Sequence, residues 1–423
     1  MKIIFPLLFA FLFTNIFAQT NLEYYLNNGI ENSPTLKEIK NSESGIELQS
    51  KLNDAQTSSF NTFLSANYLF APYFNNNGKI ISTNPDPNAI GYDASITNGG
   101  LYSAQLNIER NIFNGGLTSA LENQITNQKN LYNYNYQLEL RNLKKQITEQ
   151  YLNAHKSLMI YNLSDETVKN ISEQLKLTGE LVKQGYVKSQ NYLLLKIELQ
   201  SQQIVLFENW QQYKNGLIQL NSLVGITDTQ TVLLDSVLIE IKSSKSDFNF
   251  SQKFNLDSLT AINQQELFET KYNPQVKLFF NTGLNAIEIS GIQRKFGLSA
   301  GIDFQLPLFD GGQKDITRQQ NEIAINSIEN YKYFALSNIE NQKQIAYSNI
   351  LVIKQNLISI NAQLNDYKQL VELSNNQLKI GDLSMIEYLS ILKNFIDLQK
   401  TKIEKEIQLQ LETSNYNYWD EML

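Results

Sequence analysis

Four stretches of the chain alternate apolar and polar residues with a period of two, which is the pattern of β-strands with two different faces. The most regular stretch alternates apolar residues with Gly, Ser, Asp and Gln from Phe296 to Leu306. The spacing predicts strands over about residues 60–71, 101–113, 275–284 and 295–309. Turn-rich segments separate the first strand from the second and the third from the fourth, so each pair is expected to form a hairpin.

Long segments without proline, and almost without glycine, follow each hairpin. Residues 117–184 and 313–380 are rich in Gln, Leu, Ile, Lys and Glu, and each predicts a helix of roughly 100 Å at about 1.5 Å per residue. Helices over about 186–224 and 382–418 are expected to return along them. Within 350–378, apolar residues recur alternately three and four positions apart, with Ser374 as the one polar member. This predicts a coiled-coil seam.

Several short motifs recur at a fixed offset of 196 residues. The matching sets are Gly115 and Gly116 with Gly311 and Gly312, Gly185 with Gly381, and Tyr192-Leu193 with Tyr388-Leu389. A fixed offset indicates an internal duplication, with repeats over residues 19–225 and 274–423 and a linking segment over 226–273. Neither Gly-Gly pair belongs to a G-x-G-x-x-G or Walker sequence, so the four glycines are expected at strand-to-helix corners.

Residues 1–18 have the pattern of an export signal. Lys2 supplies the positive charge, residues 3–13 are almost wholly apolar, and Ala18 precedes the expected cut. The mature chain has no run of eighteen apolar residues, so only a closed barrel of its strands would cross a membrane. Four strands are too few for one barrel. Two chains would give eight strands and three would give twelve, and the periodicity does not choose between them.

Composition excludes several classes of protein. Lys and Arg number 35 against 42 Asp and Glu, and the net charge of −7 argues against a nucleic-acid-binding surface. Without cysteine there is no disulfide, thiolate metal site or catalytic thiol. The single histidine, His155, lies in a predicted helix. We expect no enzymatic activity, metal or cofactor; a pair of catalytic carboxylates is the one alternative that stays open.

The order of these elements resembles the TolC-like outer-membrane efflux family. The resemblance covers nearly the whole mature chain and is most specific at residues 307–312 and at Gly381 to Ser384 with Tyr388-Leu389 following. It implies an α+β membrane protein that forms a homotrimer, with a twelve-stranded β-barrel in the outer membrane and an α-helical tunnel through the periplasm. The implied partners are outer-membrane lipid, a periplasmic adaptor and an inner-membrane pump, with residues 226–273 at the tunnel's equator.

The resemblance also implies particular sites. Aligned on Gly381, Glu387 takes the first of two acidic positions that ring the closed tunnel entrance, whereas the second is Ser390 and the usual basic position is Leu383. A periplasmic gate is therefore expected with a reduced ring that binds cations weakly. The turns expected to face the adaptor are Gly185, Tyr186, Val187, Lys188 and Ser189, and Gly381, Asp382, Leu383 and Ser384.

The polar faces of the strands are expected to line the lumen of the barrel. The residues are Gln105, Asn107, Glu109, Lys277, Asp303 and Gln305. Charges of both signs among amides indicate a wide, weakly selective conduit. The favoured function is a passive outer-membrane channel of a tripartite efflux or secretion system, whose cargo could be drugs, metals or a secreted protein. The alternative is a structural or adhesive coiled-coil surface protein without a pore.

Overall fold

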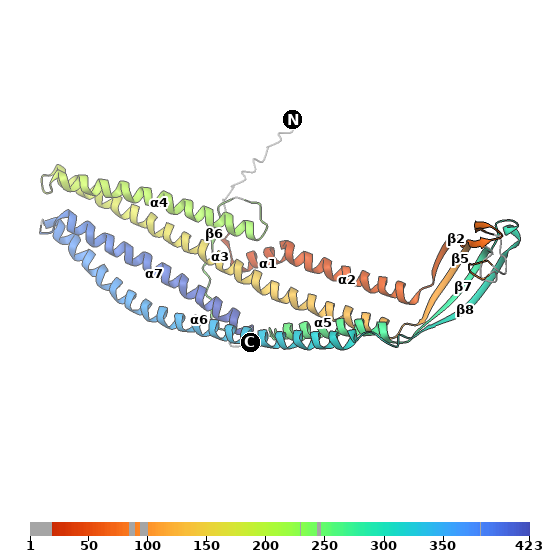
Figure 1. Ribbon diagram of the computed structural model, residues 1–423. Coiled ribbons are helices and arrows are strands. Elements are labelled where there is room, and N and C mark those ends of the chain that lie inside the picture. Colours follow the sequence, from red (N-terminus) through yellow and green to blue (C-terminus); the bar gives the residue numbers. More distant parts are fainter. Residues whose placement is uncertain (1–18, 84–88, 94–99, 229, 243–246, 381) are drawn as a thin grey trace, which may run out of the picture. The chain divides into compact units, whose positions relative to one another are not determined.

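A computed structural model describes residues 19–83, 89–93, 100–228, 230–242, 247–380 and 382–423. The expected signal peptide, residues 1–18, lies outside the described residues. Long helices and a small antiparallel sheet make up the chain (Figure 1), which confirms the α+β fold class for the single chain. Within the described part, no helix is both long and apolar enough to cross a membrane.

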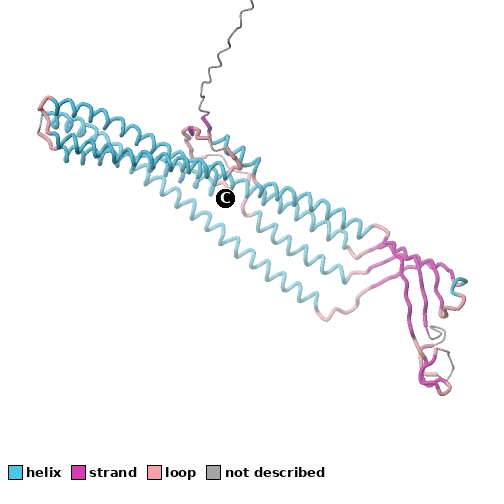
Figure 2. The backbone as a smooth tube through the Cα atoms, turned by 90° about the horizontal axis from the view of Figure 1, so that it is seen from above, coloured by secondary structure: helices cyan, strands magenta, loops and turns pink. Residues whose placement is uncertain are grey.

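The chain divides into two compact units that do not coincide with the sequence repeats, since each unit takes segments from both. The helical unit comprises Met1–Glu38, Asn135–Ser251 and Tyr333–Leu423. The sheet unit comprises Ile39–Tyr134 and Gln252–Lys332. Helix and strand are shown by colour in Figure 2.

The α-helices are α1 (Leu22–Asn32), α2 (Pro34–Ser58), α3 (Leu117–Lys183), α4 (Ser189–Leu223), α5 (Gln252–Glu269), α6 (Gln313–Ile380) and α7 (Met385–Asp420). The main sheet contains β2 (Asn61–Phe70), β5 (Gly100–Phe113), β7 (Gln275–Ala286) and β8 (Phe296–Gln305). Two short pairs are β1 (Gln19–Thr20) with β6 (Leu233–Leu234) and β3 (Tyr73–Asn76) with β4 (Lys79–Ser82). Two 3-10 turns are η1 (Thr270–Tyr272) and η2 (Ile292–Arg294).

The observed bounds differ from the sequence pattern in a few places. Strand β8 ends at Gln305 instead of continuing to about 309, and the proline at 307 has no N–H to donate to a ladder. The pattern gave no sign of α2, because its buried residues mix apolar Ile46 with polar Asn53 and Thr57 and leave no clean stripe. Helices α4 and α7 each start three residues later than the pattern indicates, after a turn.

The four-stranded sheet has the order β2-β5-β7-β8, and every neighbouring pair is antiparallel. Each expected hairpin forms, and β5 joins β7 so that the two repeats share one sheet. Side chains of directly paired residues project from the same face. Hence one face carries Ser65, Gln105 and Asn281, and the other carries Leu64, Leu106 and Phe280.

The helical unit confirms the predicted seam. On α6, Ile350, Ile353, Ile360 and Ser374 are buried, and the five other seam residues are half-buried, whereas most residues between them are exposed. Helix α7 runs beside α6 (Figure 1), and Asn349 Nδ2 donates to Glu412 Oε1 at 3.2 Å. The same positions in the first repeat, displaced by 196 residues, are also buried or half-buried along α3.

A strap formed by the described part of residues 226–242 crosses the helices of this unit. The Tyr151 hydroxyl donates to the carbonyl of Asp235 at 2.7 Å, and that of Tyr213 donates to the carbonyl of Val232. On α7, Asn417 Nδ2 donates to the carbonyl of Glu240 at 2.8 Å, and its Oδ1 accepts from the N–H of Lys242 at 3.0 Å. Polar side chains thus tie the strap to both helix pairs.

In the sheet unit, a glutamate on α5 forms ion pairs with two basic residues on α6. The Arg318 guanidinium donates to Glu269 at 2.8 and 3.0 Å, and Lys314 Nζ lies 3.3 Å away. The Arg318 hydrogen bonds are the main cause that lowers the pKa of Glu269 to about 2. Because the pKa of Glu269 in the folded chain lies below the usual 4.5, its ion pairs stabilise the fold fully above about pH 4.5. This stabilisation is lost as the pH falls through about 2 and the carboxylate becomes protonated.

We therefore expect Glu269→Gln to lower the free energy of unfolding by about 1 kcal/mol at pH 7, a modest value because these ion pairs are partly exposed. Thermal unfolding followed by circular dichroism in detergent would measure it, and the difference from the native chain should vanish near pH 2. Glu322→Gln, at an exposed α6 residue in none of the ion pairs among the described residues, is the control. An equal loss in both variants would contradict the assignment.

Candidate functional site

The first candidate feature is the pair of turns at one end of the helical unit. At the end of α3, the N–H of Tyr186 donates to the carbonyl of Leu181 at 3.0 Å, and the N–H of Gly185 to that of Val182. Gly185 has φ +82°, as expected of a glycine that ends a helix in the left-handed region. Exposed residues follow: Tyr186, Lys188 and Ser189, with Val187 half-buried.

The second turn repeats the first at the same offset. The N–H of Asp382 donates to the carbonyl of Gln377 at 3.0 Å, the counterpart of the bond between Tyr186 and Leu181. Gly381 itself lies outside the described residues. The backbone therefore uses the same type of helix ending in both repeats, which brings each return helix back along its partner.

The two turns differ in how the return helix starts. Lys188 precedes α4 without a side-chain cap, whereas Ser384 and Glu387 form a reciprocal capping box on α7. The Ser384 hydroxyl accepts from the N–H of Glu387 at 3.2 Å, and Glu387 Oε2 accepts from the N–H of Ser384 at 3.0 Å. The carboxylate expected at the gate therefore also holds the first turn of its helix.

The hydrogen bonds from Ser384 lower the pKa of Glu387, so its carboxylate is charged at neutral pH. Both Glu387 and Ser390 are exposed, one turn apart on α7. Leu383, at the position expected to be basic, is half-buried instead and packs against apolar neighbours. A carboxylate and a hydroxyl are thus available at this end of the chain, and the usual basic partner is replaced by an apolar contact.

A tip cluster of buried residues lies just behind the turns. It consists of Ile171, Leu195, Met385 and Tyr388, so α3, α4 and α7 meet there. Gln174 Nε2 on α3 donates to the Tyr388 hydroxyl, and burial raises the pKa of that tyrosine. The sequence pattern missed this cluster, although Tyr192 and Tyr388 recur at the repeat offset. The two copies differ because Tyr192 lies against Gly179 and stays half-buried.

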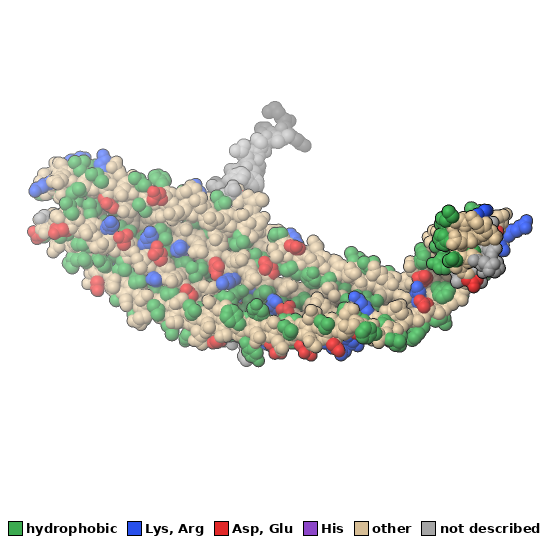
Figure 3. Space-filling model, in the orientation of Figure 1, with side chains coloured by type: hydrophobic (Ala, Val, Ile, Leu, Met, Phe, Trp, Pro, Cys, Tyr) green, Lys and Arg blue, Asp and Glu red, His purple; other side chains and the backbone are tan. Residues whose placement is uncertain are grey.

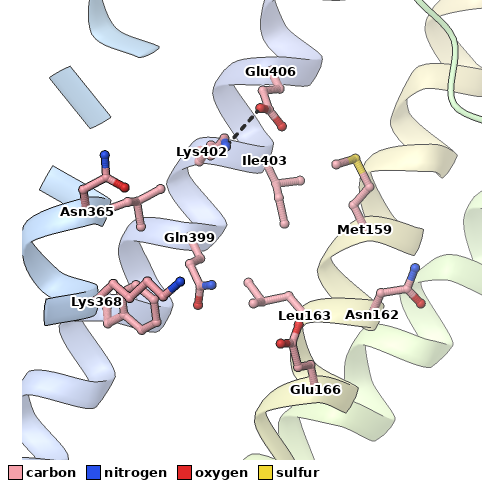
Figure 4. A pocket seen from close by; sticks show the side chains of 12 residues that line it. Met159, Asn162, Leu163, Glu166, Asn365, Lys368, Gln399, Lys402, Ile403 and Glu406 are labelled. Carbon is pink, nitrogen blue, oxygen red and sulfur yellow. Dashed lines mark ion pairs between the residues drawn. The ribbon is translucent and has the colours of Figure 1, made fainter. Parts of the chain in front are cut away.

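A groove runs between α3 on one side and α6 and α7 on the other (Figure 4). Its volume is about 470 Å³, and its walls carry apolar Met159 and Ile403 beside charged Lys368, Glu166 and the ion pair of Lys402 with Glu406 at 3.7 Å. The walls come from segments more than 190 residues apart in the chain. No local motif could have signalled it.

The second candidate feature is the polar face of the sheet. Asn107 Nδ2 donates to Ser65 Oγ at 2.8 Å, and Lys277 Nζ lies 3.3 Å from Glu109 Oε2. Register places Asp303 directly opposite Lys277. Gln105 lies on the same face opposite Ser65, and Gln305 lies opposite Gln275 at the end of the β7–β8 ladder. The expected lumen residues therefore share one face.

The predicted corner glycines lie between strand and helix in both repeats. Their φ angles are positive: +64° at Gly115, +90° at Gly116, +68° at Gly311 and +82° at Gly312. Asp310 accepts from the N–H groups of Gly312 and Lys314 at 2.8 and 2.9 Å, which fixes the start of α6 and lowers the pKa of that carboxyl. Hydrogen bonds within the second loop thus satisfy these backbone N–H groups. Among the described residues, no three metal-ligating side chains lie close enough to hold an ion.

Gly185→Ala should destabilise the helical unit by about 1 kcal/mol, because a Cβ disfavours the left-handed backbone. Thermal unfolding followed by circular dichroism would measure the change. Gly45 in α2 is the matched control, since it is exposed, has ordinary helical φ and leaves open space for a Cβ. Gly45→Ala should raise stability by up to about 1 kcal/mol. The turn conformation would be wrong if both variants shifted stability in the same direction.

No model of a known protein family matches the chain, and no curated protein matches its sequence. Solved structures do resemble it in fold. A membrane protein from Pseudomonas aeruginosa has a TM-score of 0.73 at 13% identity, covering 95% of this chain and 91% of the other. The CmeC outer membrane channel of Campylobacter jejuni gives 0.69 at 14%, covering 95% and 85%. The outer membrane protein VceC of Vibrio cholerae gives 0.68 at 13%, covering 94% and 96%. The expected resemblance is thus confirmed at the level of fold: this chain has the fold of these membrane proteins, two of which are outer-membrane proteins.

Proposed function

We propose that this chain is the outer-membrane channel of a tripartite efflux or secretion system, a passive conduit without catalysis. The observation that carries the proposal is the two-faced sheet, whose polar and apolar faces have no covering layer among the described residues of the sheet unit. On the apolar face Leu64, Leu298 and Ile302 are exposed, and Leu298 retains 72% of its accessible surface. Hydrophobic side chains are visible on the surface of the sheet in Figure 3. Water is a poor environment for this face, and lipid is a good one.

Aromatic residues mark both ends of the apolar face, as in barrels that span a bilayer. Phe296 and Phe304 bound β8, and Tyr68 packs on Tyr102 with ring centroids 4.9 Å apart at the loop end of β2 and β5. From Phe296 to Phe304 the strand spans about 27 Å at ~3.4 Å per residue. Tilted by ~40°, it would cover about 21 Å of depth, close to the ~25 Å apolar band of such barrels.

In the part of the chain that the structure describes, the sheet also has two free edges, β2 and β8. Strands β2 and β8 run in opposite directions, because the sheet has an even number of antiparallel strands. Strand β8 of one copy can therefore pair with β2 of the next without breaking the alternation, and a ring of copies removes all edges. The family resemblance implies three copies, which would form a homotrimer with a twelve-stranded barrel. The polar face would then line the lumen.

Charges on the polar face support a weakly selective conduit. Glu109 is paired with Lys277, and Asp303 adds a second carboxylate opposite the same lysine. The rest of this face mixes amides and hydroxyls, among them Asn107 and Ser65, with a few apolar residues such as Phe279. Ions and larger polar solutes would cross without a specific binding site.

The helical unit would supply the periplasmic part of the tunnel. Its two exposed turns, at residues 185–189 and 382–384, are the proposed contacts for a periplasmic adaptor that links the channel to an inner-membrane pump. Glu387 and Ser390 lie just behind the second turn, where a gate would be controlled by adaptor binding. In a purely structural or adhesive surface protein the apolar face of the sheet would have no lipid to contact, so we favour the channel.

Adjacent residues on opposite faces of β8 test this proposal. Ala300→Lys should block insertion into lipid vesicles, because Ala300 lies midway between Phe296 and Phe304 on the apolar face, and a lysine on a lipid-facing strand costs about 2–4 kcal/mol near mid-membrane. Ser299→Lys, on the polar face, should insert and conduct like the native chain. Heat-modifiable migration would measure insertion, planar-bilayer recording would measure conductance, and native mass in detergent should show three copies. Equal tolerance of both substitutions, with no conductance from the native chain, would exclude a channel.

The gate has a separate test. Glu387→Gln keeps a capping side chain but removes one charge per copy. Half-block by divalent cations should then need at least roughly fivefold more ion, the factor that corresponds to about 1 kcal/mol for one nearby charge in water. Ser384→Ala is the matched control, since it removes the cap and leaves the charge. It should loosen α7 without weakening the block by the same factor. If Glu387→Gln left both conductance and block unchanged, Glu387 would not be at the gate.

A further inference from the structure

One charged side chain interrupts the otherwise uncharged apolar face of the sheet. Register assigns Arg110 to this face, opposite Leu278 on β7, which is itself opposite Ile302 on β8. Along the paired residues of this face every other side chain is uncharged, from Thr62 to Phe70 on β2 and from Phe296 to Phe304 on β8. The exception is placed at the end where the strands join the helices.

No acidic residue in the described part of the chain forms an ion pair with Arg110. The carboxylate of its neighbour Glu109 projects from the opposite face and is engaged by Lys277 at 3.3 Å. None of the hydrogen bonds and ion pairs among the described residues involves the Arg110 guanidinium. The guanidinium lies over the ring of Phe60, whose centroid is 5.0 Å from Cζ. The guanidinium is held over an aromatic ring while its N–H donors stay unused.

The surroundings of Arg110 combine apolar surface with room for a polar ligand. Phe60, Phe113 and Phe304 are exposed on the same face at this end of the sheet. A cavity of about 370 Å³ at the helix-side edge of the sheet is lined by Arg110, Gln56 and Ser59, and also by the paired Glu109 and Lys277 of the polar face. The exposed Arg110 guanidinium therefore borders open space at this edge. Aromatic rings with an exposed cation at the edge of an apolar band are the chemistry of a membrane interface.

We propose that Arg110 binds the phosphate of a membrane phospholipid at the helix-side boundary of the apolar band. The planar guanidinium offers parallel N–H donors that match two phosphate oxygens, and the Phe60 ring keeps it oriented. The three phenylalanines would lie at the level of the headgroups, with acyl chains against Leu278 and Ile302. The site fixes how deeply the sheet sits in the bilayer. It rests on the proposed function, because it requires the apolar face to contact lipid.

The test compares retained phospholipid in the purified full-length oligomer. Native mass spectrometry with added phosphatidylglycerol should show bound lipid on the native chain. Arg110→Gln should weaken binding by at least about tenfold, the loss expected for one charge-assisted bidentate contact, and Arg110→Lys should fall between the two. Arg294→Gln is the matched control, since Arg294 lies in η2, between β7 and β8 at the opposite end of the sheet, and its binding should equal that of the native chain.

Two ligands distinguish a lipid site from a plain anion site. Diacylglycerol, which has the same acyl chains but no phosphate, should not raise the thermal stability of the native chain as phosphatidylglycerol does. Inorganic phosphate alone should not raise it either; if it did so as strongly as the lipid, the site would be an anion site and the inference would be overturned. Conductance of every variant is recorded in parallel. A native chain that never conducts would refute the proposed function, whereas a conducting Arg110→Gln that retains lipid like the native chain would refute this inference alone.

Discussion

A helix as long as α6 is stable only while its apolar stripe is buried against other helices, and the rest of the helical unit follows from this requirement. Isolated helices gain little from their own hydrogen bonds in water, so tertiary burial must supply the difference. The stripe from Ile350 to Leu378 is covered along its length, and its counterpart on α3 is covered as well. Helices α4 and α7 help to cover these stripes. They can do so because tight turns after α3 and α6 reverse the direction of the chain.

The sheet differs from the helices, because a single chain, in the part that the structure describes, neither pairs its edge strands nor covers its apolar face. Among the described residues, both edges lack a partner strand, and no layer covers the apolar face within the sheet unit. An even strand number lets identical copies meet antiparallel, and a lipid environment would cover the face. The two units therefore bury their apolar residues in different ways. The helices bury their stripe within the chain, whereas in the proposed channel the strands pair with other copies and contact lipid.

Much of the fold could be predicted from sequence where a period is long and uninterrupted. The seam of α6 and the alternation of β8 are such cases, and both are found within a few residues of their predicted bounds. Helix α2 could not be predicted, because Asn53 and Thr57 occupy buried positions and remove the stripe. The candidate residues had three sources in the sequence: the repeated glycines indicated the turns, the alternation of the strands indicated the polar face, and the family resemblance indicated Glu387. The groove beside Met159 and the contact of Gln174 with Tyr388 join residues far apart in the chain, and no local pattern records them.

The sequence by itself determined the kinds of elements, their order, the duplication and the two faces of the sheet, because periods of two and of seven are written in consecutive residues. Only the tertiary structure decided what particular side chains do there. It tied the carboxylate of Glu387 into a capping box and buried Tyr388, while its repeat partner Tyr192 stayed half-buried. It also placed Arg110 over Phe60, with no acidic partner among the described residues. These outcomes depend on which groups arrive from distant segments, and the distances between such groups exist only once the chain is folded.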